Sequence, residues 1–113
     1  MENVIYNELR KQGYGVDVGI VESFKRDENG KLQRRNLEID FVVNRHDERL
    51  YIQSAFALPD KEKVDQEQAP LLNVNDGFRK LIIVGDRYHS RYNEEGILMM
   101  SLSDFLLGKG SKE

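Results

Sequence analysis

The stretch LEIDFVVNRHDERLYIQSAFAL, residues 37–58, decides the fold because it contains two apolar segments joined by a short polar turn. The first segment, centred on IDFVV, is nearly continuous in apolar character except at Asp40, and the second carries Gln53 within it. Such runs are typical of strands covered on both faces, so we predict two adjacent central strands. A carboxylate and an amide in such strands need either hydrogen-bond partners or a chemical role.

The segments that precede this stretch have a helical pattern followed by a strand pattern and a turn. Gly13 ends the helical pattern, and Asn29-Gly30 favours a hairpin because both residues tolerate a positive φ. We predict a helix, a strand and a second strand over residues 2–12, 16–25 and 33–44, and a third strand over residues 49–58. Short connections between three consecutive strands predict an antiparallel meander.

After Leu58 the pattern changes to helix formers. We predict a helix that is interrupted before Pro70, a buried strand over residues 81–84, a polar loop over residues 87–96, a strand over residues 97–101 and a last helical turn. Ser101 and Asp104 have capping-box spacing in front of that turn. The predicted order is α-β-β-β-α-β-β-α, an α/β domain over residues 1–108 with a mixed sheet flanked by helices, in which the strand after the second helix is parallel to its neighbour. A flexible tail over residues 109–113 follows.

Composition restricts the partners of this domain. The 113 residues include 17 basic and 20 acidic side chains, and the net charge of -3 gives no overall attraction to a polyanion. Any contact with nucleic acid must therefore be local. There is no cysteine and no apolar run of membrane-spanning length, so we expect a cytoplasmic domain without a membrane partner.

The element order and the polar residues resemble the restriction-endonuclease-like core of the PD-(D/E)XK nuclease superfamily. The residues that carry this resemblance are Glu2 in the first helix, Asp40 in EIDFV, and Gln53-Ser54-Ala55 in YIQSA. In that superfamily a helix glutamate, a second-strand aspartate and a third-strand E-x-K form the site. Here the third-strand glutamate falls on Gln53 and the lysine on Ala55.

A closer resemblance covers most of the chain. The strings ENVIYNELRKQGYGVDVG, EIDFVV, YIQSAFAL and PLLNVNDGFRKLIIVGD are similar to the C-terminal domain of unknown function of prokaryotic AAA-type ATPases. The resemblance implies that glutamine at the glutamate position of the E-x-K motif is typical of that family. The resemblance implies an upstream ATPase domain in a longer parent protein, and it implies that these 113 residues are a C-terminal fragment of it.

Two interpretations of the acidic positions remain open. Phosphodiester hydrolysis in the nuclease superfamily needs carboxylates that hold Mg²⁺ or Mn²⁺, and a lysine that aligns or deprotonates the attacking water. Glu2 and Asp40 are the candidate metal ligands. Gln53 stands in place of the family glutamate and is uncharged, and Ala55 stands in place of the family lysine. The resemblance therefore implies a degenerate domain that binds DNA or another protein, and the alternative is a weak metal-dependent nuclease.

A structural role is the competing explanation for the same polar residues. Asp40 would then be satisfied by backbone donors or an arginine, and Gln53 would form hydrogen bonds across the sheet. For contact with nucleic acid, the densest basic cluster is KLQRR, which offers Lys31, Arg34 and Arg35. The exposed edge of the meander is suited to pairing with a second copy, but the sequence does not determine the oligomeric state.

Overall fold

The central hairpin of the chain forms as its apolar pattern predicts. In the computed structural model, which describes residues 1–85 and 87–108, β2 (Leu32–Arg45) and β3 (Glu48–Ala55) pair antiparallel. Their partners β1 (Gly15–Arg26) and β4 (Arg79–Val84) extend the sheet, antiparallel beside β2 and parallel beside β3 respectively. The predicted meander and the predicted parallel crossover are therefore both confirmed.

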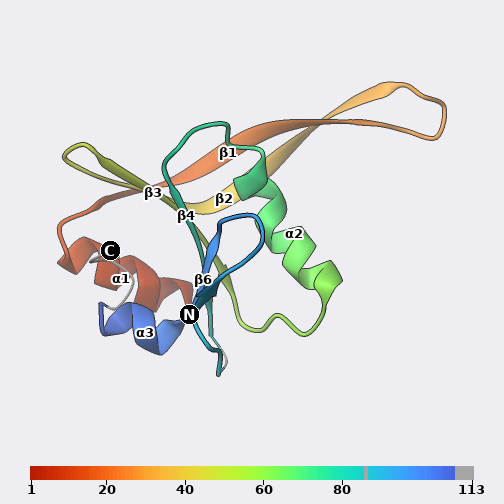
Figure 1. The fold of residues 1–113 in the computed structure, drawn as a ribbon. Helices are drawn as coiled ribbons and strands as arrows, with labels where there is room; N and C mark the ends of the chain where they lie inside the picture. The colour runs from red at the N-terminus through yellow and green to blue at the C-terminus, as the bar shows by residue number, and fades with distance from the viewer. Residues whose placement is uncertain (86, 109–113) are drawn as a thin grey trace.

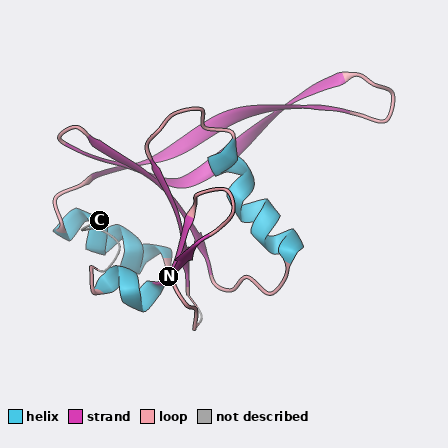
Figure 2. Cartoon of the chain, viewed as in Figure 1, coloured by secondary structure: helices cyan, strands magenta, loops and turns pink. Residues whose placement is uncertain are grey.

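Among the described residues, three helices cover a mixed sheet of six strands in the order β1-β2-β3-β4-β6-β5. Figures 1 and 2 show the helices and the sheet. The helices are α1 (Glu2–Lys11), α2 (Lys61–Leu72) and α3 (Leu102–Leu106), and the last two strands are β5 (Arg91–Tyr92) and β6 (Leu98–Ser101). The fold is thus α/β with a mixed sheet. None of the helices in the described ranges is long and apolar enough to cross a membrane.

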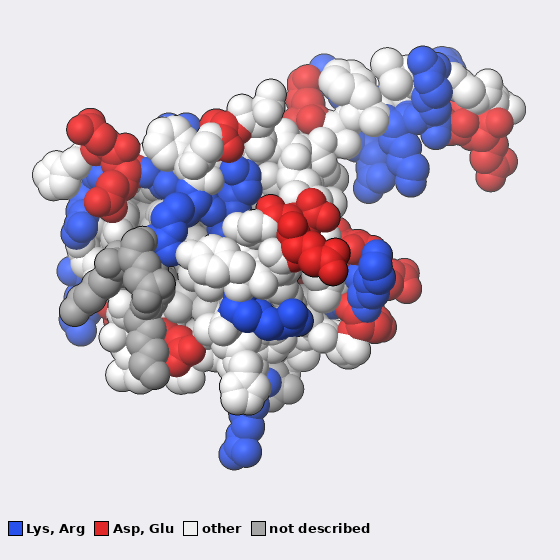
Figure 3. Space-filling view, in the orientation of Figure 1, with Lys and Arg blue, Asp and Glu red and all other residues white. Residues whose placement is uncertain are grey.

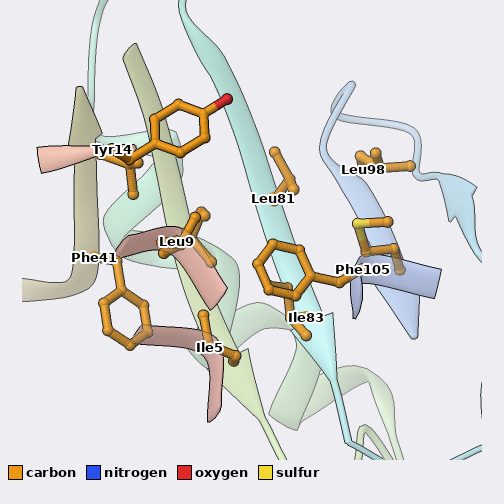
Figure 4. Packing of buried hydrophobic residues seen from close by; sticks show 11 residues of the cluster. Ile5, Leu9, Tyr14, Phe41, Leu81, Ile83, Leu98 and Phe105 are labelled. Carbon is orange, nitrogen blue, oxygen red and sulfur yellow. The ribbon is translucent and has the colours of Figure 1, made fainter. Parts of the chain in front are cut away.

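Each face of the sheet packs against its own helices. On the face that we call the α1 side, residues from α1, α3 and the sheet form one core (Figure 4): Ile5, Leu9, Tyr14, Phe41, Val43, Ile52, Leu81, Ile83, Leu98, Met100 and Phe105. On the opposite face, the α2 side, the buried core consists of Ile39, Tyr51, Ala55, Leu71, Ile82, Val84, Ile97 and Met99. The central strands are apolar at successive positions because both of their faces are covered.

A bulge in β2 changes which residues face each side. Asp17 pairs with Val42 and Gly19 pairs with Ile39, so β2 contains one more residue than β1 over this interval. A Cβ atom at position 19 would collide with the Val42 side chain, which explains the glycine. Because of the bulge, Phe41 packs on the α1 side while Ile39 and Val42 pack on the α2 side.

Beyond the bulge, β1 and β2 extend away from the body as a two-stranded arm, which we define as residues 20–37 (Figure 1). Its end is held by Asp27, whose carboxylate accepts hydrogen bonds from the backbone N–H of Asn29 and Lys31 at 2.9 Å and from the Gln33 amide at 3.1 Å. These hydrogen bonds lower the pKa of Asp27. In the predicted turn only Gly30 has a positive φ, so Asn29 does not use that conformation.

Three details differ from the sequence prediction. The polar loop contains β5, an edge strand of two residues too short to produce an alternating pattern, so the order has one more strand than predicted. The third strand ends at Ala55, and Phe56 is 77% exposed. The second helix runs through Pro70 without interruption, since proline adopts a helical φ and its ring is buried here. The tail predicted over residues 109–113 lies outside the described residues.

The last helix begins with the predicted cap, in modified form. The Ser101 hydroxyl accepts a hydrogen bond from the Asp104 N–H at 3.1 Å. The reciprocal bond of a capping box runs through a third residue, because the Ser101 N–H donates to the Ser90 hydroxyl, which donates to the Asp104 carboxylate at 2.6 Å. This relay ties the loop before β5 to the start of α3.

The loop between α2 and β4 is held by a phenol–carboxylate pair. The Tyr51 hydroxyl donates to Asp76 at 2.5 Å, and Lys80 lies 3.7 Å from the same carboxylate. Burial, followed by the hydrogen bond to Asp76, raises the pKa of Tyr51. Burial acts to raise the pKa of Asp76, but the bonds from Tyr51 and the Phe78 N–H together with Lys80 hold it below its usual range.

We expect this pair to make stability depend on pH in acid. A carboxylate whose pKa is lowered on folding contributes stability above its ordinary pKa and loses it as the pH falls through the folded value. Tyr51→Phe should cost about 1 kcal/mol at pH 7 and less than that in acid below the folded pKa of Asp76, where this carboxyl is protonated in both states. Urea unfolding at both pH values measures this, with Tyr92→Phe, which lies in an exposed position, as the control. Equal costs at the two pH values would contradict the role of Asp76.

Candidate functional site

The predicted site lies where β2 separates from β3. The paired ladder between these strands ends at Phe41 and Ile52, and side chains replace it beyond that point. The Asp40 N–H donates to the Gln53 side-chain oxygen at 2.7 Å. In return, Asp40 Oδ2 accepts from the Ser54 N–H at 2.9 Å and from the Ser54 hydroxyl at 3.1 Å. Asp40 and Gln53 therefore each satisfy a backbone group of the strand opposite.

The remaining end of Gln53 bonds to α2. Its Nε2 donates to the backbone oxygen of Glu67 at 3.1 Å, and the side chain is only 4% exposed. Gln53 thus joins three elements, β2, β3 and α2, through a single amide group.

The two polar side chains reach opposite faces of the sheet. Side chains alternate along β3, and Ile52 packs on the α1 side while Ala55 packs on the α2 side. Gln53 consequently extends towards α2, whereas the Ser54 hydroxyl that contacts Asp40 lies on the α1 side. Asp40 and Gln53 are therefore neighbours in space, but Gln53 reaches towards α2 while Asp40 contacts Ser54 on the other side of the sheet.

The position that resembles the family lysine is a packed core position. Ala55 is 4% exposed and belongs to the core on the α2 side together with Leu71 and Ile82. Its carbonyl accepts a hydrogen bond from the Gly85 N–H at 2.8 Å. A lysine at this position would have to place its ammonium group among apolar side chains, which is costly without a partner.

Glu2, the third predicted residue, is exposed in the first turn of α1. The neighbouring Met1 side chain lies against Gly85, so the start of α1 is at the end of the sheet where β4 finishes. In the described parts of the chain, no group of three or more His, Cys, Asp or Glu side chains is arranged to hold a metal ion. The structure therefore brings Asp40, Gln53 and Ser54 together and records no contact that joins Glu2 to them.

The predicted basic residues all lie on the arm. Arg34 pairs with Glu22 across the strands at 3.5 Å, and both side chains are more than half exposed. Arg35 lies with Lys25 beside a hollow of about 520 Å³ near the turn. Sequence reasoning missed Lys25 and Arg26, although the hairpin register that places them opposite Gln33 and Leu32 follows from the position of the turn.

The arm differs in charge from the rest of the molecule. Five basic and three acidic residues lie in residues 20–37, which gives the arm a net charge of +2 in a chain whose total is -3. Figure 3 shows Lys and Arg side chains over the middle of the projecting hairpin and acidic side chains near its two ends, whereas side chains of both signs lie on the body. The arm is thus a cationic element on an anionic domain.

Comparisons with known proteins concern the fold and give no information on the chemistry of the site. No protein-family profile matches the chain. An uncharacterized protein of Haemophilus influenzae is 34% identical over 107 residues, a match that covers 95% of this chain and 22% of the relative. The chain therefore spans less than a quarter of that relative's length.

Solved structures extend the comparison to the fold. The crystal structure of AF1548, a protein of unknown function, matches with a TM-score of 0.55 and 18% sequence identity, over 97% of this chain and 65% of that one. At this identity the similarity concerns the fold alone. Neither protein has a described activity, so the site is interpreted from its own geometry.

Proposed function

We propose that this chain is a degenerate nuclease-like domain that serves as a binding module of a longer, ATPase-containing protein and does not hydrolyse phosphodiesters itself. The main observation behind the proposal is that both ends of the Gln53 amide form internal hydrogen bonds. Its oxygen accepts from the Asp40 N–H and its nitrogen donates to the Glu67 carbonyl. A group engaged in this way is not available as a metal ligand. The ATPase attachment rests on the sequence resemblance, and the much greater length of the Haemophilus influenzae relative is consistent with it.

The arm supports DNA as the partner. Affinity for DNA comes largely from basic side chains that contact phosphates, and five basic residues lie in the arm. Arg34 and Arg35 lie next to each other in β2 and point to opposite faces of the ribbon, so they can contact different parts of a DNA backbone. The net negative body would be repelled by DNA, which restricts contact to the arm.

One observation favours a metal-dependent nuclease as the second candidate. Both of the hydrogen bonds that Asp40 accepts from Ser54 end on one oxygen, Oδ2. Within residues 1–85 and 87–108 no hydrogen bond is recorded to Asp40 Oδ1, and the residue is only partly buried. A divalent cation could bind this oxygen together with water molecules.

The test measures binding and hydrolysis on the same labelled DNA duplex with Mg²⁺ or Mn²⁺. We expect binding without cleavage, and we expect the double variant Arg34→Gln/Arg35→Gln to weaken binding about tenfold and to reduce its salt dependence. Lys61→Gln/Lys63→Gln on α2 removes the same charge and serves as the control. Cleavage that Asp40→Asn abolishes would contradict the absence of catalysis. Equal binding by both double variants would contradict the role of the arm and favour a protein partner.

A further inference from the structure

The outer edge of β1 is a long strand edge without a partner. Among the described residues only β2 pairs with β1, which therefore ends the sheet and exposes one row of its backbone groups along residues 15–26. Exposed edges of this length usually carry a protective proline or are covered by another element, because they pair readily with other strands. β1 contains no proline.

An apolar stripe follows the same strand. Val18, Ile20 and Phe24 stand at alternate positions of β1 on the face that also carries Glu22, and the three apolar side chains are 62%, 70% and 57% exposed. Val16, which shares this face, is partly buried in the core on the α1 side. The stripe thus continues that core outward along the arm without a cover, and large apolar side chains gathered in this way mark interaction sites.

The sequence of β1 is complementary to itself in one antiparallel register. A two-fold axis through Val21 would place Asp17 of one copy opposite Lys25 of the other, and Val18 opposite Phe24, each pair occurring twice. Shifting the axis to Glu22 would place two glutamates opposite each other and leave Lys25 opposite Gly19. Shifting it to Ile20 would place Asp17 opposite Ser23. Of these three registers, the one centred on Val21 alone pairs opposite charges and also places Val18 opposite Phe24.

The charges in this register are available for such pairing. Neither Asp17 nor Lys25 forms an ion pair with any other residue in the described ranges, and both are exposed. We infer that the chain forms a symmetric dimer by antiparallel pairing of β1 with β1 of a second copy, centred on Val21. The two sheets then form one continuous sheet across the axis. This inference does not depend on the proposed function, and it leaves Arg34 and Arg35 of β2 outside the new ladder.

The first experiment measures the mass of the 113-residue chain by sedimentation velocity over a range of concentrations. We expect the 13.2 kDa monomer to convert to a species of twice that mass as concentration rises. Asp17→Lys and Lys25→Asp should each weaken the dimer about tenfold, because each places like charges opposite each other at two symmetric positions. The double variant Asp17→Lys/Lys25→Asp exchanges the charges and should restore dimerisation. Lys31→Asp, in the turn of the arm outside the ladder, is the control and should change little.

The second experiment tests the register through crosslinking, which the absence of native cysteine makes unambiguous. In the inferred register Val21 faces its own copy, so Val21→Cys should form a disulfide-linked dimer under mild oxidation. Ser23, two residues further along the same face, lies opposite Gly19, so Ser23→Cys should not.

The outcomes separate the inference from its alternatives. A chain that stays monomeric at all concentrations would overturn it. Dimerisation that is unchanged in both single charge-reversal variants, without crosslinking through Val21→Cys, would also overturn it. Another surface would then hold the two copies together. Crosslinking by Ser23→Cys in place of Val21→Cys would overturn the register.

Discussion

Ile82→Ala and Ile83→Ala should each lower the free energy of unfolding by about 2–5 kcal/mol, although the two residues are neighbours in β4 and point in opposite directions. Both side chains are 0% exposed. Ile83 packs in the core on the α1 side and Ile82 in the core on the α2 side. Each truncation would remove apolar contacts and leave a cavity that the neighbouring helices only partly fill.

Urea unfolding followed by circular dichroism measures both losses, and Leu72→Ala is the matched control. Leu72 is 46% exposed at the end of α2, so its truncation should cost less than about 1 kcal/mol. A cost for Ile82→Ala no larger than that of the control would mean that α2 does not cover its face of the sheet. Since a domain of this size has a total stability of roughly 5–15 kcal/mol, either isoleucine variant should remain folded but lose much of its margin.

The pairing of the central strands could be predicted because its signals are local. The apolar runs on either side of the turn at residues 45–48 identify two central strands, and the helix that follows Pro59 requires a crossover to a parallel neighbour. Both predictions are confirmed by the pairings of β3 with β2 and with β4. Likewise, the cap at Ser101 follows from residue types at fixed spacing.

The details that could not be predicted depend on contacts between distant residues. The bulge opposite Gly19 exchanges the faces of β2 between Ile39 and Phe41, and simple alternation gives no sign of it. β5 exists only because Arg91 and Tyr92 pair with Met99 and Leu98. Short segments of this kind take their structure from a neighbour, so their own sequence contains little information about it.

The sequence indicated the residues of the candidate site but not all of their contacts. The sequence identified Asp40 and Gln53, and the structure places them in contact through backbone donors, which was one of the explanations left open. It did not identify Ser54 as the partner of Asp40 or Glu67 as the partner of Gln53. Those partners depend on the separation of β2 from β3 and on the position of α2, neither of which is a local property.

Substitutions of Gln53 should distinguish a structural amide from the remnant of a metal site. Gln53→Leu leaves the Asp40 N–H and the Glu67 carbonyl without their partner inside the protein, which should cost about 2–4 kcal/mol of stability. Gln66→Leu, at an exposed position of α2, should cost little. Urea unfolding measures both, and equal costs would contradict the structural role of the amide.

Gln53→Glu carries the test further because it restores the carboxylate of the family pattern. One carboxylate oxygen can still accept from the Asp40 N–H, but the other faces the Glu67 carbonyl, to which only a protonated carboxyl can donate. Burial and this contact should raise the folded pKa of the new carboxyl above its unfolded value near 4.3. Stability should therefore be greater at pH 4 than at pH 7, since a raised carboxyl pKa loses stability as the pH rises through it.

The same substitution at an exposed position, Gln66→Glu, should show no comparable dependence on pH. Adding Mg²⁺ at pH 7 then separates the two interpretations of the site. If Gln53 is a structural amide, the cation leaves the stability of Gln53→Glu unchanged. If the fold retains a cation site, Mg²⁺ should stabilise Gln53→Glu and not Gln66→Glu, because a ligand that binds only the folded state raises the free energy of unfolding. That second result would contradict the purely structural role of Gln53 and would favour the nuclease interpretation over the binding module.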